Sequence, residues 1–127
     1  MKPPRFDYYA PNKIEEALSL LDQYGDDAKI LAGGQSLMPL LNMRLARPSV
    51  LIDINKIKDL AYINETTDGG LRIGALARQS TAERLPMVSN RNPLLAAAIP
   101  YIGHFQIRNR GTIGGSLAHA DPSAELP

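Results

Sequence analysis

The sequence predicts an α+β chain of two lobes, on the strength of two observations. Residues 1–57 alternate short apolar segments with an amphipathic helix, in the strand–helix–strand order that is typical of a small parallel α/β lobe. After residue 57 the pattern changes to a hairpin followed by short helices. We therefore expect an N-terminal α/β lobe over 1–57 and the start of a second α+β lobe over 58–127.

The first helix of this lobe has clear signals at both ends. The stretch Asn12-Lys13-Ile14-Glu15 has the spacing of a capping box, in which an N-cap residue is followed by an acid three positions later. Apolar residues then recur at positions 14, 17, 18 and 21, which is the period of one helix face. Gly25 supplies the C-terminal stop.

Two apolar segments in the same lobe are predicted to be buried strands. The first covers Lys29–Ala32 and ends at a glycine pair, and the second covers Val50–Ile54. Between them, Ser36 is expected to cap a short helix over residues 37–41 through its hydroxyl. Pro48 is expected to end that segment.

The second lobe is predicted to begin with a hairpin. Residues 61–66 and 71–75 flank the turn Thr67-Asp68-Gly69-Gly70. The stretch Ser80-Thr81-Ala82-Glu83 has the form of a second capping box, so we expect it to open a short helix that ends before Pro86.

A further helix is predicted over Leu94–Ile99. Asn92 can cap it, and Pro93 occupies the favoured first position. Pro100 is expected to break or kink this helix. From Tyr101 onward glycines and short polar residues dominate, so the sequence predicts a long irregular loop, which in an ordered domain is usually functional.

Composition excludes several classes of function. The 127 residues carry a net charge of +1, and their 14 basic residues are scattered, so there is no nucleic-acid footprint. Cysteine is absent, which excludes disulfides and thiolate-bound metal clusters in this chain, and two lone histidines form no metal site. No segment approaches the length of a membrane span or of a signal-peptide core. We expect a soluble cytoplasmic protein.

The first glycine pair has the chemistry of an anion site. A backbone that must approach a ligand closely needs residues without a Cβ, and only glycine adopts positive φ at low cost. In Gly33-Gly34-Gln35-Ser36 a strand leads into the loop, the serine adds a hydroxyl, and a helix follows. Taken alone, this pair also fits a plain strand-to-helix turn that holds no ligand.

The second pair favours a ligand. Thr112-Ile113-Gly114-Gly115-Ser116 repeats the order of hydroxyl, apolar residue, two glycines and hydroxyl. Two such loops can clamp one pyrophosphate from both sides, whereas two unrelated turns need not look alike. We therefore expect both glycine pairs to lie around a single anion-sized concavity.

These two motifs also carry a family resemblance. "AGGQSLMPLLNMRL" together with "HFQIRNRGTIGGSLAHADPSAE" resembles the FAD-binding medium subunit of molybdenum-containing hydroxylases, which include aerobic carbon monoxide dehydrogenase and the xanthine dehydrogenase group. The resemblance extends in order from "FDYYAP" through "LIDI" and "LRIGAL" to "ADPSAE". It implies the two-lobed α+β flavin domain of the vanillyl-alcohol-oxidase or PCMH type, of which this chain would be an N-terminal portion.

The resemblance also implies a cofactor site. In that family the first motif and the second hold the FAD pyrophosphate, the segment matching Ile102-Gly103 packs near the flavin and ribityl chain, and an acid at the position of Glu125 contacts the nucleotide side. The residues implied are Ala32, Gly33, Gly34, Gln35, Ser36, Leu37, Ile102, Gly103, Thr112, Ile113, Gly114, Gly115, Ser116 and Glu125.

The implied partners are other subunits. The substrate would be oxidised at a molybdenum cofactor on a large subunit, and electrons would pass through iron–sulfur clusters on a small subunit to FAD and then to an external acceptor. No residue here is a convincing acid, base, nucleophile or metal ligand, and flavin electron transfer needs none, because the cofactor carries the redox chemistry.

Four other polar positions have plainer interpretations. We expect His104 and Arg108 to rigidify the second motif through local hydrogen bonds, and Asp121-Pro122 to form a turn after an Asx-type bond. Asp53 stands at a strand end, but the sequence offers it no partner.

Two alternatives to an electron-transfer subunit stay open. One is a free-standing flavin oxidase of the same fold, which would need its own substrate pocket. The other is a truncated, non-catalytic fragment that only oligomerises. Apolar surface normally covered by missing strands would favour self-association of such a fragment, and isolated it would hold FAD poorly.

Overall fold

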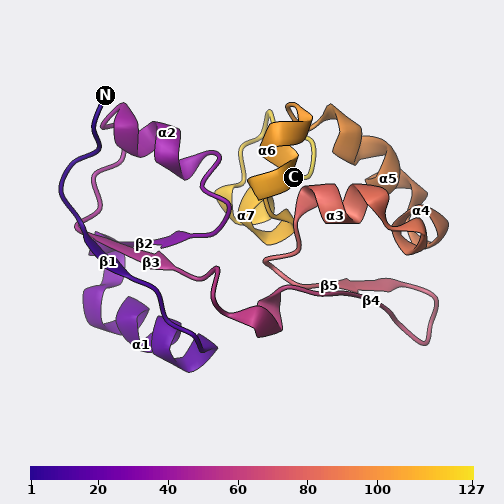
Figure 1. The fold of residues 1–127 in the computed structure, drawn as a ribbon, viewed down its shortest axis with the longest axis horizontal. Helices are drawn as coiled ribbons and strands as arrows, with labels where there is room; N and C mark the ends of the chain where they lie inside the picture. Colours follow the sequence, from indigo (N-terminus) through magenta and orange to yellow (C-terminus); the bar gives the residue numbers. More distant parts are fainter. The chain divides into compact units, whose positions relative to one another are not determined.

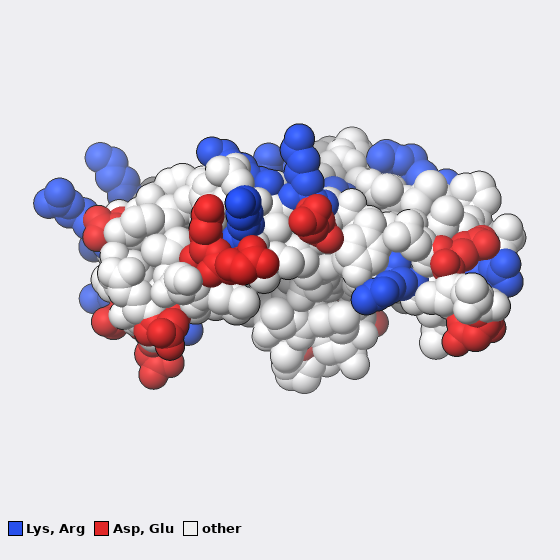
Figure 2. Space-filling view, turned by 90° about the horizontal axis from the view of Figure 1, so that it is seen from below, with Lys and Arg blue, Asp and Glu red and all other residues white.

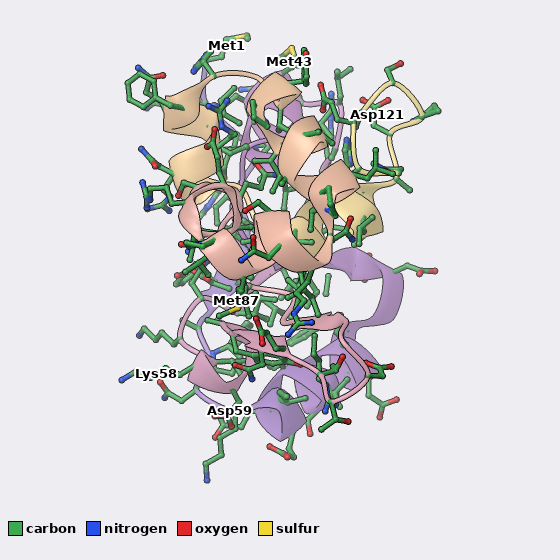
Figure 3. The ribbon with its side chains drawn as sticks, turned by 90° about the vertical axis from the view of Figure 1, so that its right-hand side faces the viewer. Met1, Met43, Lys58, Asp59, Met87 and Asp121 are labelled. Atoms are coloured by element: carbon green, nitrogen blue, oxygen red, sulfur yellow. The ribbon has the colours of Figure 1, made fainter.

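The computed structural model describes residues 1–127, which divide into two compact units, Met1–Lys58 and Asp59–Pro127. Figure 3 labels the two residues at the junction, Lys58 and Asp59. The division falls one residue after the expected end of the first lobe. Each unit has its own buried residues and its own sheet.

The first unit is built on a three-stranded parallel sheet (Figure 1). Its strands are β1 (Asp7–Tyr9), β2 (Ala28–Leu31) and β3 (Val50–Asp53), in the order β1-β3-β2. Tyr8 and Lys29 both lie beside Leu51 of the central strand. The parallel arrangement is the one the sequence predicts, although β1 was not anticipated because three residues are too few to establish a period.

The position of each strand in the sheet determines how much of it is buried. The central strand β3 is paired on both sides, and Val50, Leu51 and Ile52 are 2%, 1% and 0% exposed. The expected burial of the segment before the glycine pair is wrong for most of its length: β2 is an edge strand, and Ile30 is 37% exposed. Both strands have similar apolar sequences, so only their pairing distinguishes them.

Helix α1 (Ile14–Tyr24) ends as predicted but begins differently. Gly25, at φ +53°, caps its C-terminus. The expected capping box at Asn12 and Glu15 is wrong, because no side chain caps this N-terminus and the Asn12 N–H donates to Glu16 instead, at 3.3 Å. The helix therefore starts one residue later than the motif indicates. It runs beside the sheet (Figure 1), and of its apolar positions only Ala17 is buried, whereas Ile14 and Leu18 are 37% and 58% exposed.

Helix α2 (Leu37–Asn42) follows the first glycine pair and lies beyond the other side of the sheet (Figure 1). Leu41 anchors it and is fully buried. The expected hydroxyl cap is wrong, since Ser36 precedes the helix but its side chain makes no cap bond. Pro48 does not end the helix either: the chain leaves it at Asn42, and Arg44 already has φ +59°.

The second unit begins with the predicted hairpin. Strands β4 (Ile63–Glu65) and β5 (Leu71–Ile73) pair antiparallel, and the Thr66 N–H donates to the Gly70 carbonyl across the turn. This expectation is confirmed. The hairpin leads into a group of short helices: α3 (Gln79–Arg84), α4 (Pro86–Arg91), α5 (Pro93–Ala98), α6 (Phe105–Arg110) and α7 (Ile113–His119).

Three of these helices differ from the sequence prediction. Helix α4 was not expected, and the long loop predicted after Tyr101 is wrong, because α6 and α7 both lie in it. Each has only six or seven residues, too few for the apolar period to register. Such short helices are stabilised by tertiary packing rather than by their own propensity.

The starts of α3 and α5 show which capping signals are reliable. Asn92 caps α5 as predicted, accepting a hydrogen bond from the Leu95 N–H at 3.0 Å. Pro100 falls in a single 3-10 turn after α5, which confirms the predicted break. The second capping box is wrong: α3 begins before Ser80, with Arg78 as its N-cap and no side-chain cap bond.

The core of the second unit joins its helices to the hairpin. Its buried members come from α3, α4, α7 and the segments around them: Ala77, Ala82, Val88, Ile99, Ile102 and Ile113. Ile63, Leu71 and Ile73 of the hairpin pack against this cluster, and so does Leu126 near the end of the chain. The core therefore holds the backbone before α6 and the first residue of α7 in place.

We expect Asn92→Ala to lower the free energy of unfolding by about 1 kcal/mol, because it removes the side-chain acceptor for an otherwise unpaired helix N–H. Asn92→Gly is the matched control and should cost only a few tenths of a kcal/mol. Urea unfolding followed by circular dichroism measures both. Equal losses for the two variants would contradict a capping role.

Candidate cofactor-binding site

The first glycine motif lies at the edge of the sheet where parallel strands end. All three strands of the first unit run in the same direction, so their carboxyl ends share this edge, which is the usual ligand position in such sheets. Gly34 has φ +76°, and a Cβ there would stand 3.2 Å from both Leu31 Cδ1 and Met38 Cγ. A larger residue would thus be strained and would fill the turn.

The backbone of this turn presents donors with no partner in the chain. The N–H groups of residues 33–36 make no intrachain hydrogen bond. In contrast, the preceding carbonyls are bonded: the Asn55 side-chain amide donates to Ala32 at 2.7 Å, and the Met38 N–H donates to Gly34 at 3.0 Å. A row of free donors in a turn with one glycine at positive φ fits the phosphates of a dinucleotide.

A carboxylate at the end of β3 supports this turn. Asp53 Oδ2 accepts from the Tyr8 hydroxyl at 2.6 Å, and Oδ1 accepts from both the backbone and side-chain amides of Asn55, at 2.9 and 2.6 Å. The expectation that Asp53 lacks a partner is wrong. Burial raises its pKa, but the hydrogen bonds from Tyr8 and Asn55, with the charge of Lys56, outweigh burial and bring the pKa below its usual value.

Asn55 is the residue of this site that sequence analysis missed. Its signal was present in the sequence: an Asp-x-Asn stretch directly after a buried strand, at the edge where parallel strands end. An Asn side chain often bonds backbone groups in such turns. The sequence alone does not show that Asn55 reaches Ala32, which lies 23 positions away.

The second glycine pair has a different structure from the first. The predicted loop is wrong here: both glycines lie in the first turn of α7, and Thr112 is the N-cap of that helix. The donors of this turn are used within the unit. Gly115 N–H donates to Thr112 Oγ1 at 3.0 Å, and the N–H groups of Ile113 and Gly114 donate to carbonyls of segment 75–77 at 2.9 and 3.0 Å.

Close packing explains one of these glycines. A Cβ on Gly114 would stand 2.6 Å from the Cα of Ala75, so the two backbones touch there. Neither Gly114 nor Gly115 has positive φ. In this motif Ser116 contributes a hydroxyl with no partner in the chain, whereas the Thr112 side chain is already engaged as the cap.

The remaining expected site residues also lie in the second unit. Ile102 is 8% exposed and its side chain belongs to the core, while its N–H donates to the Ile99 carbonyl at 3.0 Å. Gly103 is exposed at φ +48°. Glu125 is exposed and has no partner in the chain. Asp121 forms the predicted Asx turn, accepting from the Ser123 N–H at 2.9 Å.

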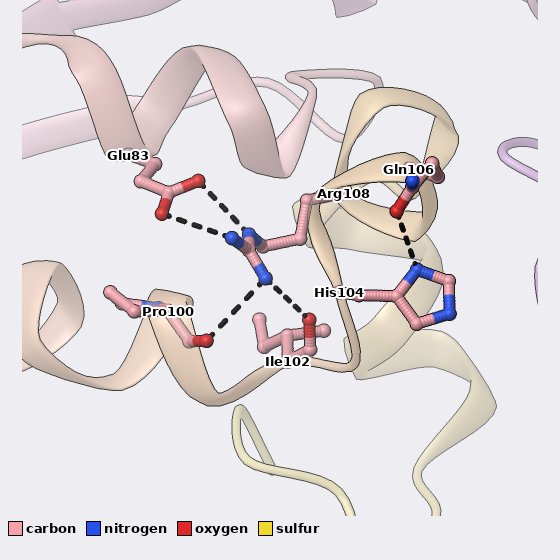
Figure 4. Close-up of polar contacts among 6 residues, drawn as sticks. All are labelled: Glu83, Pro100, Ile102, His104, Gln106 and Arg108. Carbon is pink, nitrogen blue, oxygen red and sulfur yellow. Dashed lines mark hydrogen bonds and ion pairs between the residues drawn. The ribbon is translucent and has the colours of Figure 1, made fainter.

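Arg108 fixes the backbone around Ile102 (Figure 4). Its guanidinium forms a two-point ion pair with Glu83 of α3, at 2.9 and 3.3 Å. The same group donates to the carbonyls of Ile102, at 3.0 Å, and Pro100, at 3.4 Å. Arg108 thus has a structural role, but its bonds reach Glu83, Pro100 and Ile102 rather than the second motif that it was expected to rigidify.

The two glycine motifs belong to different units. The first, with Asn55 and Asp53, lies in Met1–Lys58, and the second, with Ile102 and Gly103, lies in Asp59–Pro127. That both face one pyrophosphate stays a prediction.

The surface carries charges of both signs. On the face drawn in Figure 2, basic and acidic side chains are interspersed, and neither gathers into a continuous patch. None of the helices has the length and apolar character needed to span a bilayer. The cytoplasmic location stays a prediction.

The sequence identifies the class to which this fold and motif belong. Residues 4–127 match the family described as the FAD binding domain in molybdopterin dehydrogenase. The chain therefore belongs to this family of FAD-binding domains, as the motifs indicated.

Two relatives with named functions are similar to this chain over its whole length. The chain is 56% identical over 127 residues to the 6-hydroxypseudooxynicotine dehydrogenase complex subunit alpha of Paenarthrobacter nicotinovorans. It is 48% identical to the carbon monoxide dehydrogenase medium chain of Hydrogenophaga pseudoflava. Each match covers 100% of this chain but only 43% and 44% of the relative, so the chain spans less than half of their length.

Solved structures agree on the fold. Carbon monoxide dehydrogenase from Hydrogenophaga pseudoflava, in a form lacking the Mo-pyranopterin moiety, superposes with a TM-score of 0.96 at 49% identity. Quinoline 2-oxidoreductase from Pseudomonas putida 86 gives 0.94 at 42%. Both matches cover 100% of this chain and 44% of the other. The predicted α+β flavin-domain fold and its FAD cofactor class are confirmed.

We expect Tyr8→Phe to raise the pKa of Asp53 toward its usual value of 3.8, because the hydroxyl hydrogen bond favours the carboxylate. A lowered pKa in the folded state adds stability above the usual carboxyl range, and this is lost as the pH falls through the folded pKa. An NMR titration of the carboxyl carbon measures the pKa. The control is Asp68, whose pKa is lowered by a hydrogen bond from the Thr66 hydroxyl. The pKa of Asp68 should not change in the Tyr8→Phe variant.

We expect Arg108→Ala to lower the free energy of unfolding by about 3 kcal/mol, because it leaves Glu83 and the Ile102 carbonyl without their partner. The control is Arg91→Ala, which breaks the exposed pair with Glu65 and should cost less than about 1 kcal/mol. Urea unfolding compares the two. A loss at Arg108 no larger than that at Arg91 would show that the two-point pair adds little.

Proposed function

We propose that this chain forms part of the flavin subunit of a molybdenum hydroxylase. In this proposal FAD receives electrons from iron–sulfur clusters on a small subunit and delivers them to an external acceptor, while a large subunit carries the molybdenum cofactor. The observation that carries the proposal is the row of free N–H donors at residues 33–36, in a chain whose family is an FAD-binding domain. The relatives' names, a dehydrogenase complex subunit and a medium chain, favour a multi-subunit enzyme.

The first motif, Ala32–Leu37, is proposed to hold the diphosphate. Its free N–H groups would donate to phosphate oxygens, and the Ser36 hydroxyl adds a further donor. Gly34 lets the backbone approach, because it adopts a φ that other residues avoid and has no side chain to fill the turn.

The second motif, Thr112–Ser116, is proposed to contribute differently. The N–H groups of Ile113, Gly114, Gly115 and Ser116 are already bonded within the unit, so the motif offers the Ser116 hydroxyl and a glycine backbone without side chains. Ile102 and Gly103 would line the flavin side through their backbone, which Arg108 holds. The Glu125 carboxylate would accept hydrogen bonds on the nucleotide side.

Bound FAD supplies the redox chemistry itself, exchanging one or two electrons. The chain's own residues bind the cofactor, orient it and exclude alternative positions, and none needs to act as an acid or base. A free-standing oxidase would require a substrate pocket with a catalytic group, and no polar cluster described above favours one. The substrate of the complex belongs to the proposed molybdenum subunit.

We expect Gly34→Val to abolish FAD binding in the protein expressed from its complete gene and assembled with its partners. The branched side chain resists positive φ and would fill the turn that the diphosphate approaches. The FAD-to-protein ratio, read from the visible spectrum, measures the effect.

Gly25→Val is the matched control for this variant. Gly25 also has positive φ and lies in the same unit, but nothing stands within 4 Å of its Cβ position and it caps α1. The Gly25→Val protein should have similar backbone strain but should still bind FAD. A yellow Gly34→Val protein with the normal FAD ratio would contradict the proposal.

A further inference from the structure

We propose that Asn55 is a positioning residue that aims the free N–H donors of the first glycine motif at the cofactor diphosphate. The inference rests on the proposed function. Asn55 itself need not touch the cofactor, because it acts through the peptide bond between Ala32 and Gly33. Its side-chain amide donates to the Ala32 carbonyl at 2.7 Å.

The argument begins with peptide geometry. A trans peptide unit is planar, so the C=O of one residue and the N–H of the next point in opposite directions. Whatever holds a carbonyl on one side therefore turns the following N–H to the other side. A backbone donor in a turn can be aimed by bonding the carbonyl that precedes it.

Three consecutive carbonyls in the motif are held in this way. Ala32 accepts from Asn55 at 2.7 Å, Gly33 accepts from the Gln35 side chain at 3.3 Å, and Gly34 accepts from the Met38 N–H at 3.0 Å. The three N–H groups that follow them have no acceptor in the chain. Each of these three N–H groups therefore points away from the group that donates to the preceding carbonyl.

Asn55 differs from the other two holding groups in its origin. Gln35 belongs to the motif and Met38 to the helix that follows, so both move with the turn. Asn55 comes from the end of the central strand, and Asp53 Oδ1 fixes it through two hydrogen bonds at 2.9 and 2.6 Å. The first donor of the row, the Gly33 N–H, is thus aligned to the rigid sheet.

The chemistry of the amide is specific. Asn55 needs a donor toward the Ala32 carbonyl, and neither an apolar side chain nor a carboxylate supplies one. Without it the peptide between Ala32 and Gly33 is free to rotate. Alanine removes the donor, whereas aspartate keeps the shape, places oxygen against oxygen and adds negative charge near the diphosphate.

The test compares Asn55→Ala and Asn55→Asp with wild type and with Asn64→Ala, an exposed Asn of β4 whose side chain makes no hydrogen bond. The protein is expressed from its complete gene, assembled with its partners and stripped of flavin. FAD and ADP, which share the diphosphate but not the flavin ring, are titrated by calorimetry. Unfolding temperatures without ligand show whether each variant is folded.

We expect Asn55→Ala to weaken FAD and ADP by the same factor, about tenfold, which is the size of one hydrogen bond to a charged group. Asn55→Asp should weaken both further, and Asn64→Ala should match wild type. Equal affinities for folded Asn55→Ala and Asn64→Ala would overturn the proposal, as would a loss for FAD without a loss for ADP. Wild-type protein that binds neither ligand would overturn the proposed function as well.

Discussion

The first unit depends on the pairing of β3 with a strand on each side. Because β3 is central, its apolar side chains are almost fully buried, and its end is the most constrained point of the lobe. Asp53 stands at that end and gathers hydrogen bonds from Tyr8 and Asn55. The turn after edge strand β2 is tied to the same point through Ala32. The loop proposed to bind the cofactor follows an edge strand, and it thus obtains its rigidity from the buried strand beside it.

The two glycine pairs are alike in sequence, but glycine is required in each for a different physical reason. Gly34 is required by its positive φ and by the Leu31 and Met38 side chains, which stand 3.2 Å from the position of a Cβ. Gly114 is required by contact with the backbone at Ala75, inside a helix with ordinary dihedral angles. A repeated glycine pattern therefore indicates close backbone approach in both places, without saying whether a ligand or the protein's own chain makes the approach.

Much of the fold could be predicted from local patterns, and several of the failures arise from contacts between segments that are distant in sequence. The hairpin, the Gly25 stop and the Asn92 cap depend on neighbouring residues, and these predictions hold. The exposure of β2 depends on which strand lies next to it, and the helices after Tyr101 depend on tertiary packing. In the site, Asn55 was missed because its partner is distant in sequence.

Glu83 gives a false capping signal in the sequence and also supports the proposed site. Its spacing from Ser80 is that of a capping box, yet the carboxylate turns to the Arg108 guanidinium, which offers two charge-assisted bonds in place of one bond to a backbone N–H. Arg108 then has donors left for the carbonyl of Ile102. In each unit, a polar side chain fixed by a carboxylate holds the backbone carbonyl that precedes a glycine: Asn55 for the half-buried Gly33, and Arg108 for the exposed Gly103. The same device, a held carbonyl that orients the following N–H, is therefore available on both segments proposed to meet the cofactor.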